Sequence, residues 1–96
     1  MTNGSVREML ADLLLINGDP ASALAEYKVV LLKRPNRFDS LYGAGSAAYA
    51  QGDTAAAGVY YKQLLSFAKG DERPEIAIAR TRAVPTVSHV VAAATP

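Results

Sequence analysis

The chain has 96 residues, of which 50% are hydrophobic and 20% are charged, the composition of one globular domain rather than of a disordered segment. Ten Lys and Arg residues stand against nine Asp and Glu residues, for a net charge of +1, so the chain lacks the basic field that attracts nucleic acid or an anionic membrane. It has no cysteine, which excludes disulfides, thiol chemistry and cysteine-ligated zinc.

The first predicted helix begins near Ser5. Ser5 and Glu8 have the spacing of a capping box, in which each side chain satisfies a free backbone amide, and apolar residues follow at helical spacing. The longest apolar run in this region covers only residues 13–16, whereas a signal peptide needs about 7–15 such residues and a membrane span about 20. We therefore expect a soluble protein without a membrane partner. The net charge close to zero adds the expectation that no nucleic acid binds, and the absence of cysteine suits the cytoplasm.

A second predicted helix follows a sharp turn. Gly18 ends the first helix because glycine adopts a left-handed conformation at low cost. Asp19 caps the next helix, and Pro20 fits its first position, where no amide hydrogen bond is lost. The helix ends at the cations of residues 33–34, which suit a helix C-terminus, and Pro35 closes it.

Three further helices are predicted. Asn36 caps a third helix that runs to about Gln51, and a fourth covers roughly residues 54–68 after another Gly-Asp turn. Residues 74–83 form a fifth, amphipathic helix. Beyond Pro85 the tail has no helical period and is expected to be flexible. Because no strand pattern occurs, the predicted fold class is all-α with about five helices.

The chain matches itself at an offset of 34 residues. Over residues 18–31, seven of the fourteen positions are identical to those of residues 52–65, including a Gly-Asp pair and a Tyr-Lys pair. A repeat of this length that holds two helices is typical of stacked helical arrays. In such arrays each repeat buries its apolar side against a neighbour.

With this period and punctuation the chain resembles the tetratricopeptide repeat (TPR) family. The resemblance depends on small residues that let helix axes approach, a tyrosine in each second helix, the turn glycines and a closing proline: Ala11, Gly45, Ala23, Ala57, Tyr27, Tyr61, Gly18, Gly52 and Pro35. Arg7, Gly58 and Lys69 depart from the family pattern. The stretch from residue 35 to residue 75 is similar to the ends of longer bacterial proteins of this family.

The resemblance implies both a fold and a function. The implied fold is an α-α superhelix over residues 1–84, with repeat one at about 4–37, repeat two at about 38–71, a capping helix at about 73–83 and a tail at 85–96. Family members bind another protein or peptide in a groove, without catalysis, cofactor or metal. Carried over, the groove positions are Glu8, Asp12, Leu15, Asp39, Tyr42, Ser46 and Tyr49.

The groove residues also predict the kind of partner. Tyr42 and Tyr49 are the foremost candidates, because tyrosines give contact area at little cost in entropy. Family members that bind chaperones hold an acidic C-terminal tail with cationic residues, whereas the matching positions here carry no cation: Glu8, Asp12, Tyr42 and Ser46. We therefore expect a partner of apolar and basic character and not such a tail. Plain exposure, or burial against the fifth helix, is the alternative interpretation for each position.

Two other functions are open at this point. An array normally needs three or more repeats for stability, so the apolar side of the first repeat also predicts a homodimer or assembly unit through Val6, Leu10, Leu13 and Leu24. Within a longer chain, that side would meet upstream repeats instead. RNA binding by a related helical repeat is less favoured, because the net charge is close to zero.

No residues predict catalysis or metal binding. The single histidine, His89, lies in the tail next to Ser88, which is a poor position for a catalytic pair. Glu8 and Asp12 lie one helical turn apart, but calcium or magnesium needs about six oxygen ligands. A solvated acidic surface is the favoured interpretation of these two carboxylates.

Overall fold

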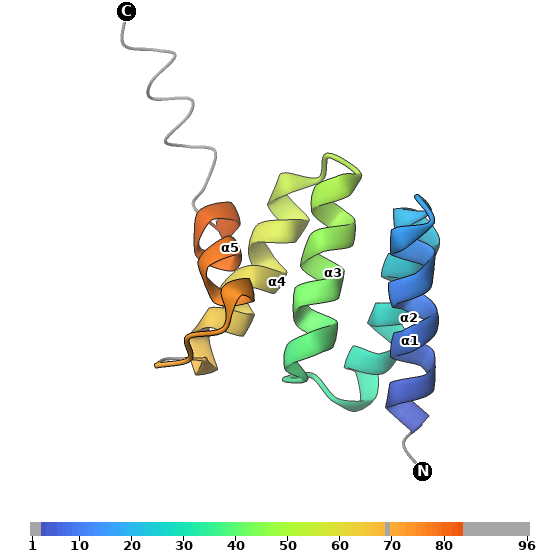
Figure 1. Cartoon of the computed structure of the whole chain (residues 1–96), viewed down its shortest axis with the longest axis horizontal. Helices are drawn as coiled ribbons and strands as arrows, with labels where there is room; N and C mark the ends of the chain where they lie inside the picture. The colour runs from blue at the N-terminus through green and yellow to red at the C-terminus, as the bar shows by residue number, and fades with distance from the viewer. Residues whose placement is uncertain (1–2, 69, 84–96) are drawn as a thin grey trace, which may run out of the picture.

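The computed structural model describes residues 3–68 and 70–83. They form five helices: α1 (Asn3–Ile16), α2 (Pro20–Lys33), α3 (Phe38–Ala50), α4 (Thr54–Phe67) and α5 (Pro74–Ala83). Consecutive helices pack against each other, and no strand occurs among the described residues (Figure 1). The predicted all-α class is confirmed, while the predicted flexible tail and His89 lie outside the described part of the chain.

The two Gly-Asp turns have the same local structure. Gly18 and Gly52 both have a φ of 83°, which glycine adopts without the clash of a Cβ atom. The carboxylates of Asp19 and Asp53 accept hydrogen bonds from backbone amides three residues ahead, at 3.2 and 3.0 Å. These bonds cap α2 and α4, so the predicted starts of both helices are confirmed.

Two other predicted helix starts are wrong. α1 already begins at Asn3 and runs through Ser5, so Ser5 is not its N-cap. α3 begins after Arg37, which is its N-cap and makes no capping hydrogen bond with its side chain. The Asn36 side chain instead accepts a hydrogen bond from Gln63 of α4 at 3.3 Å. At this helix start, a contact between distant segments prevails over the local preference of asparagine for capping.

A buried tyrosine in each helical hairpin lies against α3. Tyr27 belongs to the first hairpin (α1 and α2) and Tyr61 to the second (α3 and α4), and their exposed fractions are 1% and 0%. A Cβ atom added to Gly43 would overlap the Tyr27 ring, and one added to Gly45 would lie 2.7 Å from the Tyr61 ring. The two glycines therefore let both rings pack against the backbone of α3.

The core consists of two clusters of buried residues. The first joins α1, α2 and α3 and contains Ala11, Ala23, Tyr27, Ala44 and Ala47. The second joins α3, α4 and α5 and contains Leu41, Ala48, Ala57, Tyr61, Leu64, Ala79 and Ala83. The many alanines allow close approach of the helix axes, and the tyrosines fill the space between them.

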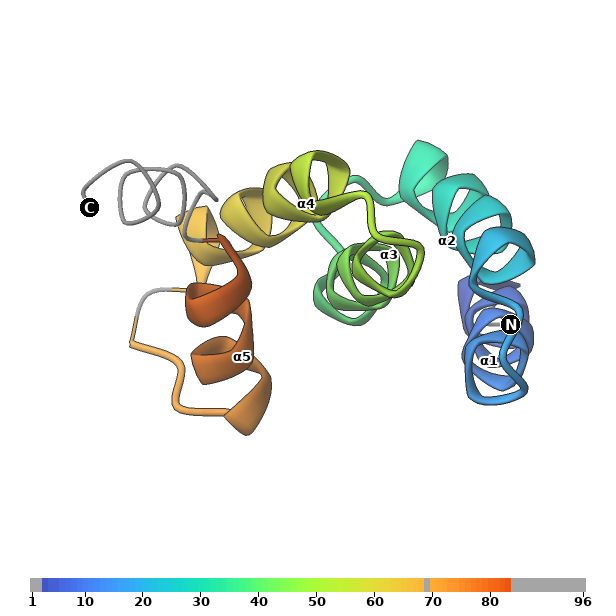
Figure 2. The ribbon, with the colours of Figure 1, turned by 90° about the horizontal axis from the view of Figure 1, so that it is seen from above.

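The five helices form a curved array. Seen from above, α2 and α4 lie on the outer side of the curve, and α1, α3 and α5 lie on the inner side (Figure 2). Two cation–π contacts link α5 and the residue before it to α3: the guanidinium of Arg73, which directly precedes α5, lies 3.6 Å from the centre of the Phe38 ring, and the Arg82 guanidinium of α5 lies 4.2 Å from the centre of the Tyr49 ring. Each such cation–π contact contributes about 0.5–1 kcal/mol at an exposed site.

Candidate functional site

The predicted groove residues come from α1 and α3, two of the three helices on the inner side of the curve (Figure 2). We call the surface of α1, α3 and α5 on this side the inner face. Of the predicted residues, Asp12, Asp39 and Tyr49 are exposed, while Leu15, Tyr42 and Ser46 are half-buried. Glu8 is buried, with an exposed fraction of 6%.

The prediction that Glu8 is a solvent-exposed groove residue is wrong. Its carboxylate accepts two hydrogen bonds from the Arg37 guanidinium, each of 2.8 Å, and one from the Ser40 hydroxyl at 2.5 Å. Burial alone would raise the pKa of Glu8, but these hydrogen bonds and the charge of Arg37 outweigh burial and hold the pKa below its ordinary value. Glu8 is part of an ion pair that joins α1 to α3, and not of a solvated acidic surface or a groove.

Asp12 and Ser46 occupy equivalent positions, 34 residues apart, and each holds the tyrosine of its own hairpin. The Tyr27 hydroxyl donates to the Asp12 carboxylate, and the hydroxyls of Ser46 and Tyr61 lie 3.2 Å apart. Burial, and then the bond to Asp12, raises the pKa of Tyr27 above its ordinary value. Both groove residues thus position a buried ring and keep only part of their hydrogen-bonding capacity for a partner.

Tyr49 is the exposed member of an aromatic–arginine cluster at the inner face. The cluster consists of Tyr42, Tyr49 and Arg82 together with the buried Tyr61 of α4. The Arg82 guanidinium covers the Tyr49 ring and donates a hydrogen bond of 3.0 Å to the Tyr61 hydroxyl. The rings of Tyr42 and Tyr61 have their centres 5.9 Å apart. Arg82 is not among the predicted site residues, since its place on an amphipathic helix indicates only exposure. Its contact with Tyr49 of α3 arises once α5 packs against α4.

A second surface, which is apolar, lies on α1 at the end of the array. Val6, Leu10 and Leu13 have exposed fractions of 68, 45 and 56%. Met9 and Ile16, which the predicted self-interface did not include, are 62 and 79% exposed. We call these five residues the end face. Large apolar side chains grouped in this way mark an interaction surface.

Leu24 does not belong to the end face. It was predicted as part of the self-interface, but its side chain is half-buried and packs against both core clusters. Its position on α2 places it between the two hairpins, where it contributes to the core. The periodicity of one helix cannot distinguish these two places, because both require an apolar residue.

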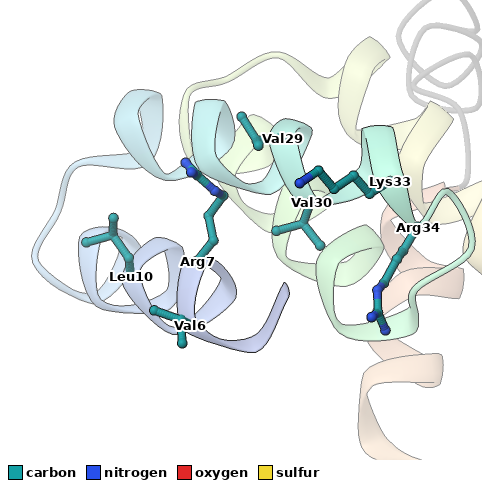
Figure 3. A pocket seen from close by; sticks show the side chains of 7 residues that line it. All are labelled: Val6, Arg7, Leu10, Val29, Val30, Lys33 and Arg34. Carbon is teal, nitrogen blue, oxygen red and sulfur yellow. The ribbon is translucent and has the colours of Figure 1, made fainter. Parts of the chain in front are cut away.

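A cavity of about 550 Å³ opens between α1 and α2 next to the end face (Figure 3). Its lining combines apolar and cationic side chains: Val6, Arg7, Leu10, Val29, Val30, Lys33 and Arg34. Arg7 forms an ion pair of 2.6 Å with Glu26. Lys33 and Arg34 leave the rim of the cavity positively charged, while the valines and Leu10 give it apolar walls.

The described residues bring together no group of three or more His, Asp or Glu side chains that could hold a metal ion. Within residues 3–68 and 70–83, no helix is long and apolar enough to cross a membrane. Comparison of the chain with protein-family models, with curated proteins and with solved structures found no match. The inner face and the end face are the two candidate interaction surfaces of the described residues.

Proposed function

We propose that the chain is a protein-interaction module of the TPR type, which binds another polypeptide through its inner face. The proposal rests mainly on one observation: the Tyr49 side chain is 42% exposed, and the Arg82 guanidinium lies over its ring, 4.2 Å from the ring centre. An aromatic side chain whose position is already fixed loses little entropy when a partner binds. Tyr42 extends the aromatic surface next to it.

The charges around Tyr49 indicate the chemistry of the partner. Asp12 and Asp39 place exposed carboxylates on α1 and α3, and Arg82 places a cation on α5. A segment with an apolar or aromatic centre, a basic residue toward the two carboxylates and an acceptor toward Arg82 is complementary to this surface. The sequence alone indicates a basic residue in the partner, and the Arg82 cation beside Tyr49 adds a hydrogen-bond acceptor. Glu8 does not contribute to this charge pattern, because its carboxylate is buried and paired with Arg37.

Acidic chaperone tails do not fit the α1 and α3 part of this surface. Holding a terminal carboxylate there requires cations, whereas Asp12 and Asp39 are exposed acids and the exposed Arg7 of α1 is paired with Glu26 of α2. Arg37 makes two hydrogen bonds to the Glu8 carboxylate, so its charge is already compensated by an ion pair. A peptide of this acidic kind therefore serves as a negative control for the inner face.

Selection of binders from a random peptide library displayed on phage, with the full chain as the target, tests the proposal. We expect enriched peptides with an aromatic or aliphatic centre next to a basic residue. Fluorescence polarisation with one such peptide should show that Tyr49→Ala raises the Kd about tenfold or more, because centrally placed aromatic residues dominate binding energy. Leu32→Ala is the matched control, since Leu32 is 82% exposed on α2.

Two results would contradict this function. One is binding of the enriched peptides that Tyr49→Ala leaves unchanged, which would place the contact elsewhere. The other is micromolar binding of a peptide with an acidic C-terminal tail. Circular dichroism of both variants establishes that a loss of binding does not come from a loss of helix.

A further inference from the structure

The end face carries an apolar seam that no described residue covers. Val6, Met9, Leu13 and Ile16 follow one another at intervals of three, four and three residues, and their exposed fractions are between 56 and 79%. Alternating intervals of three and four are the a and d spacing of a coiled coil, in which a helix packs along a partner helix. The seam therefore has the pattern of a helix that pairs with another helix.

The second hairpin shows how the same positions are covered inside the array. The residues 34 positions after those of the end face are Ser40, Gly43, Ala44, Ala47 and Ala50. All five are small, and the first four are buried. Ala44 and Ala47 share a core cluster with Tyr27 of α2, and Gly43 leaves room for the ring of that tyrosine.

The end face is not built for a helix that packs as α2 does. Met9 stands at the position equivalent to Gly43, so a tyrosine placed like Tyr27 would meet the Met9 side chain. The other end-face positions also carry larger residues than their equivalents on α3. Such a surface suits a helix that packs through large interlocking side chains at a greater separation of the axes.

We propose that the end face binds the end face of a second copy of this chain, with the two α1 helices antiparallel. Val6 of each copy then packs against Ile16 of the other, and Met9 packs against Leu13. Every seam residue meets another seam residue, as an antiparallel coiled coil requires, and the contact is the same on both copies, as a two-fold dimer requires. This inference stands independently of polypeptide binding by the inner face.

The charges along the first hairpin set the antiparallel direction. Lys33 and Arg34 line the cavity next to Val6, near the start of α1. From residue 8 to residue 27 the chain has no Lys or Arg, and the exposed Asp19 follows the end of α1. Antiparallel pairing places the cationic end of one copy next to the acidic end of the other, whereas parallel pairing would place cations against cations.

The cavity between α1 and α2 is covered in this dimer. Val6 and Leu10 line the cavity, and antiparallel pairing places Ile16 of the second copy against Val6, at the cavity mouth. The apolar walls suit this side chain, which is 79% exposed in the single chain. Its burial removes apolar surface from water and stabilises the pair.

Sedimentation velocity of the full chain over a wide range of concentrations tests the dimer. We expect a monomer–dimer equilibrium in which Leu13→Glu raises the Kd at least about tenfold, because two buried leucines become charged residues in each dimer. Leu32→Glu is the matched control, since Leu32 is exposed on α2 outside the seam. Leu13 is itself 56% exposed, so its replacement should leave the helical circular dichroism spectrum unchanged.

Cysteine pairing tests the direction of the two helices, since the natural chain has no cysteine. We expect oxidation of a mixture of the Met9→Cys and Leu13→Cys variants to give a disulfide between the two different variants, because antiparallel pairing opposes these positions. Disulfides that join like positions would overturn the antiparallel arrangement. A chain that is monomeric at every concentration, or a dimer that Leu13→Glu leaves intact, would overturn the proposed interface and leave the end face to another helix.

Discussion

Glu8 joins the two hairpins through its carboxylate, although the helical repeat does not require an acidic residue at this position. The equivalent position in the second hairpin is Tyr42. The Glu8 side chain is 8% exposed and that of Arg37 is 30% exposed, so the ion pair is buried at its acidic end and reaches solvent at its basic end. Because Arg37 and Ser40 satisfy the carboxylate with hydrogen bonds, the cost of its burial is compensated.

We expect Glu8→Gln to lower the free energy of unfolding by about 2 kcal/mol at neutral pH. Arg37 then loses its ionic partner, and an amide forms weaker hydrogen bonds than a carboxylate. Urea titration of the variant and the natural chain measures the difference. Ser66→Ala is a suitable control, because the Ser66 hydroxyl bonds only the backbone of its own helix on an exposed surface.

The pH dependence of this difference follows from the direction of the pKa shift. The pKa of Glu8 is lower in the folded chain than its ordinary value, so the unfolded chain binds the proton more tightly. The stabilisation is therefore fully present above the unfolded pKa and is lost as the pH falls through the folded pKa. The difference between Glu8→Gln and the natural chain should shrink between neutral pH and about pH 3. A difference that stays constant would contradict this account.

At the scale of the helices, local sequence determines some boundaries and not others. The turns at Gly18 and Gly52 could be predicted, because a left-handed glycine followed by a capping aspartate is a device of a few adjacent residues. The start of α1 could not be predicted in the same way, because Glu8 of the expected capping box bonds a distant residue instead. The partner of Glu8 is Arg37, which lies 29 residues further along the chain, and a local pattern contains no information about it.

The residues of the candidate surfaces also differ in whether local sequence could predict them. The exposed positions of Tyr49 and Asp39 follow from the register of a single helix, so they could be predicted. Arg82 could not, because its contact with Tyr49 of α3 depends on how α5 packs against α4. Met9 carried a signal that the prediction did not use, namely its coiled-coil spacing with neighbouring apolar residues of α1. For Leu24 the sequence holds no signal that separates core from surface, because apolar residues in both places follow the same helical period.

The close approach of α2 and α3 depends on Gly43. We expect Gly43→Ala to lower the free energy of unfolding by about 1–3 kcal/mol, because the added Cβ meets the buried Tyr27 ring. Gly58→Ala is the matched control within a helix, as an added Cβ there meets nothing within 4 Å. That variant should gain about 0.5–1 kcal/mol from helix preference. Thermal unfolding compares the two, and a Gly43→Ala chain as stable as Gly58→Ala would contradict this account.

For the whole molecule, the contacts between helices follow the order of the helices in the chain. Each helix contacts its neighbours in the chain, and α1 also contacts α3, so α1 and α5 each have a helix on one side only. In such arrays the stability of a segment depends on its own helices and on the interfaces with adjacent ones. The end helices should therefore open more readily than α3 and α4, whose residues make up most of the larger core cluster.

Hydrogen exchange at low and high protein concentration distinguishes the two ends of the array. At low concentration the amides of α1 and α5 should both exchange faster than those of α3. As the concentration rises, pairing through the end face adds a neighbour to α1 alone, so exchange should slow in α1 and stay unchanged in α5. Leu13→Glu should abolish the slowing. Equal slowing at both ends would mean that the copies associate through a surface other than the seam of Val6, Met9, Leu13 and Ile16.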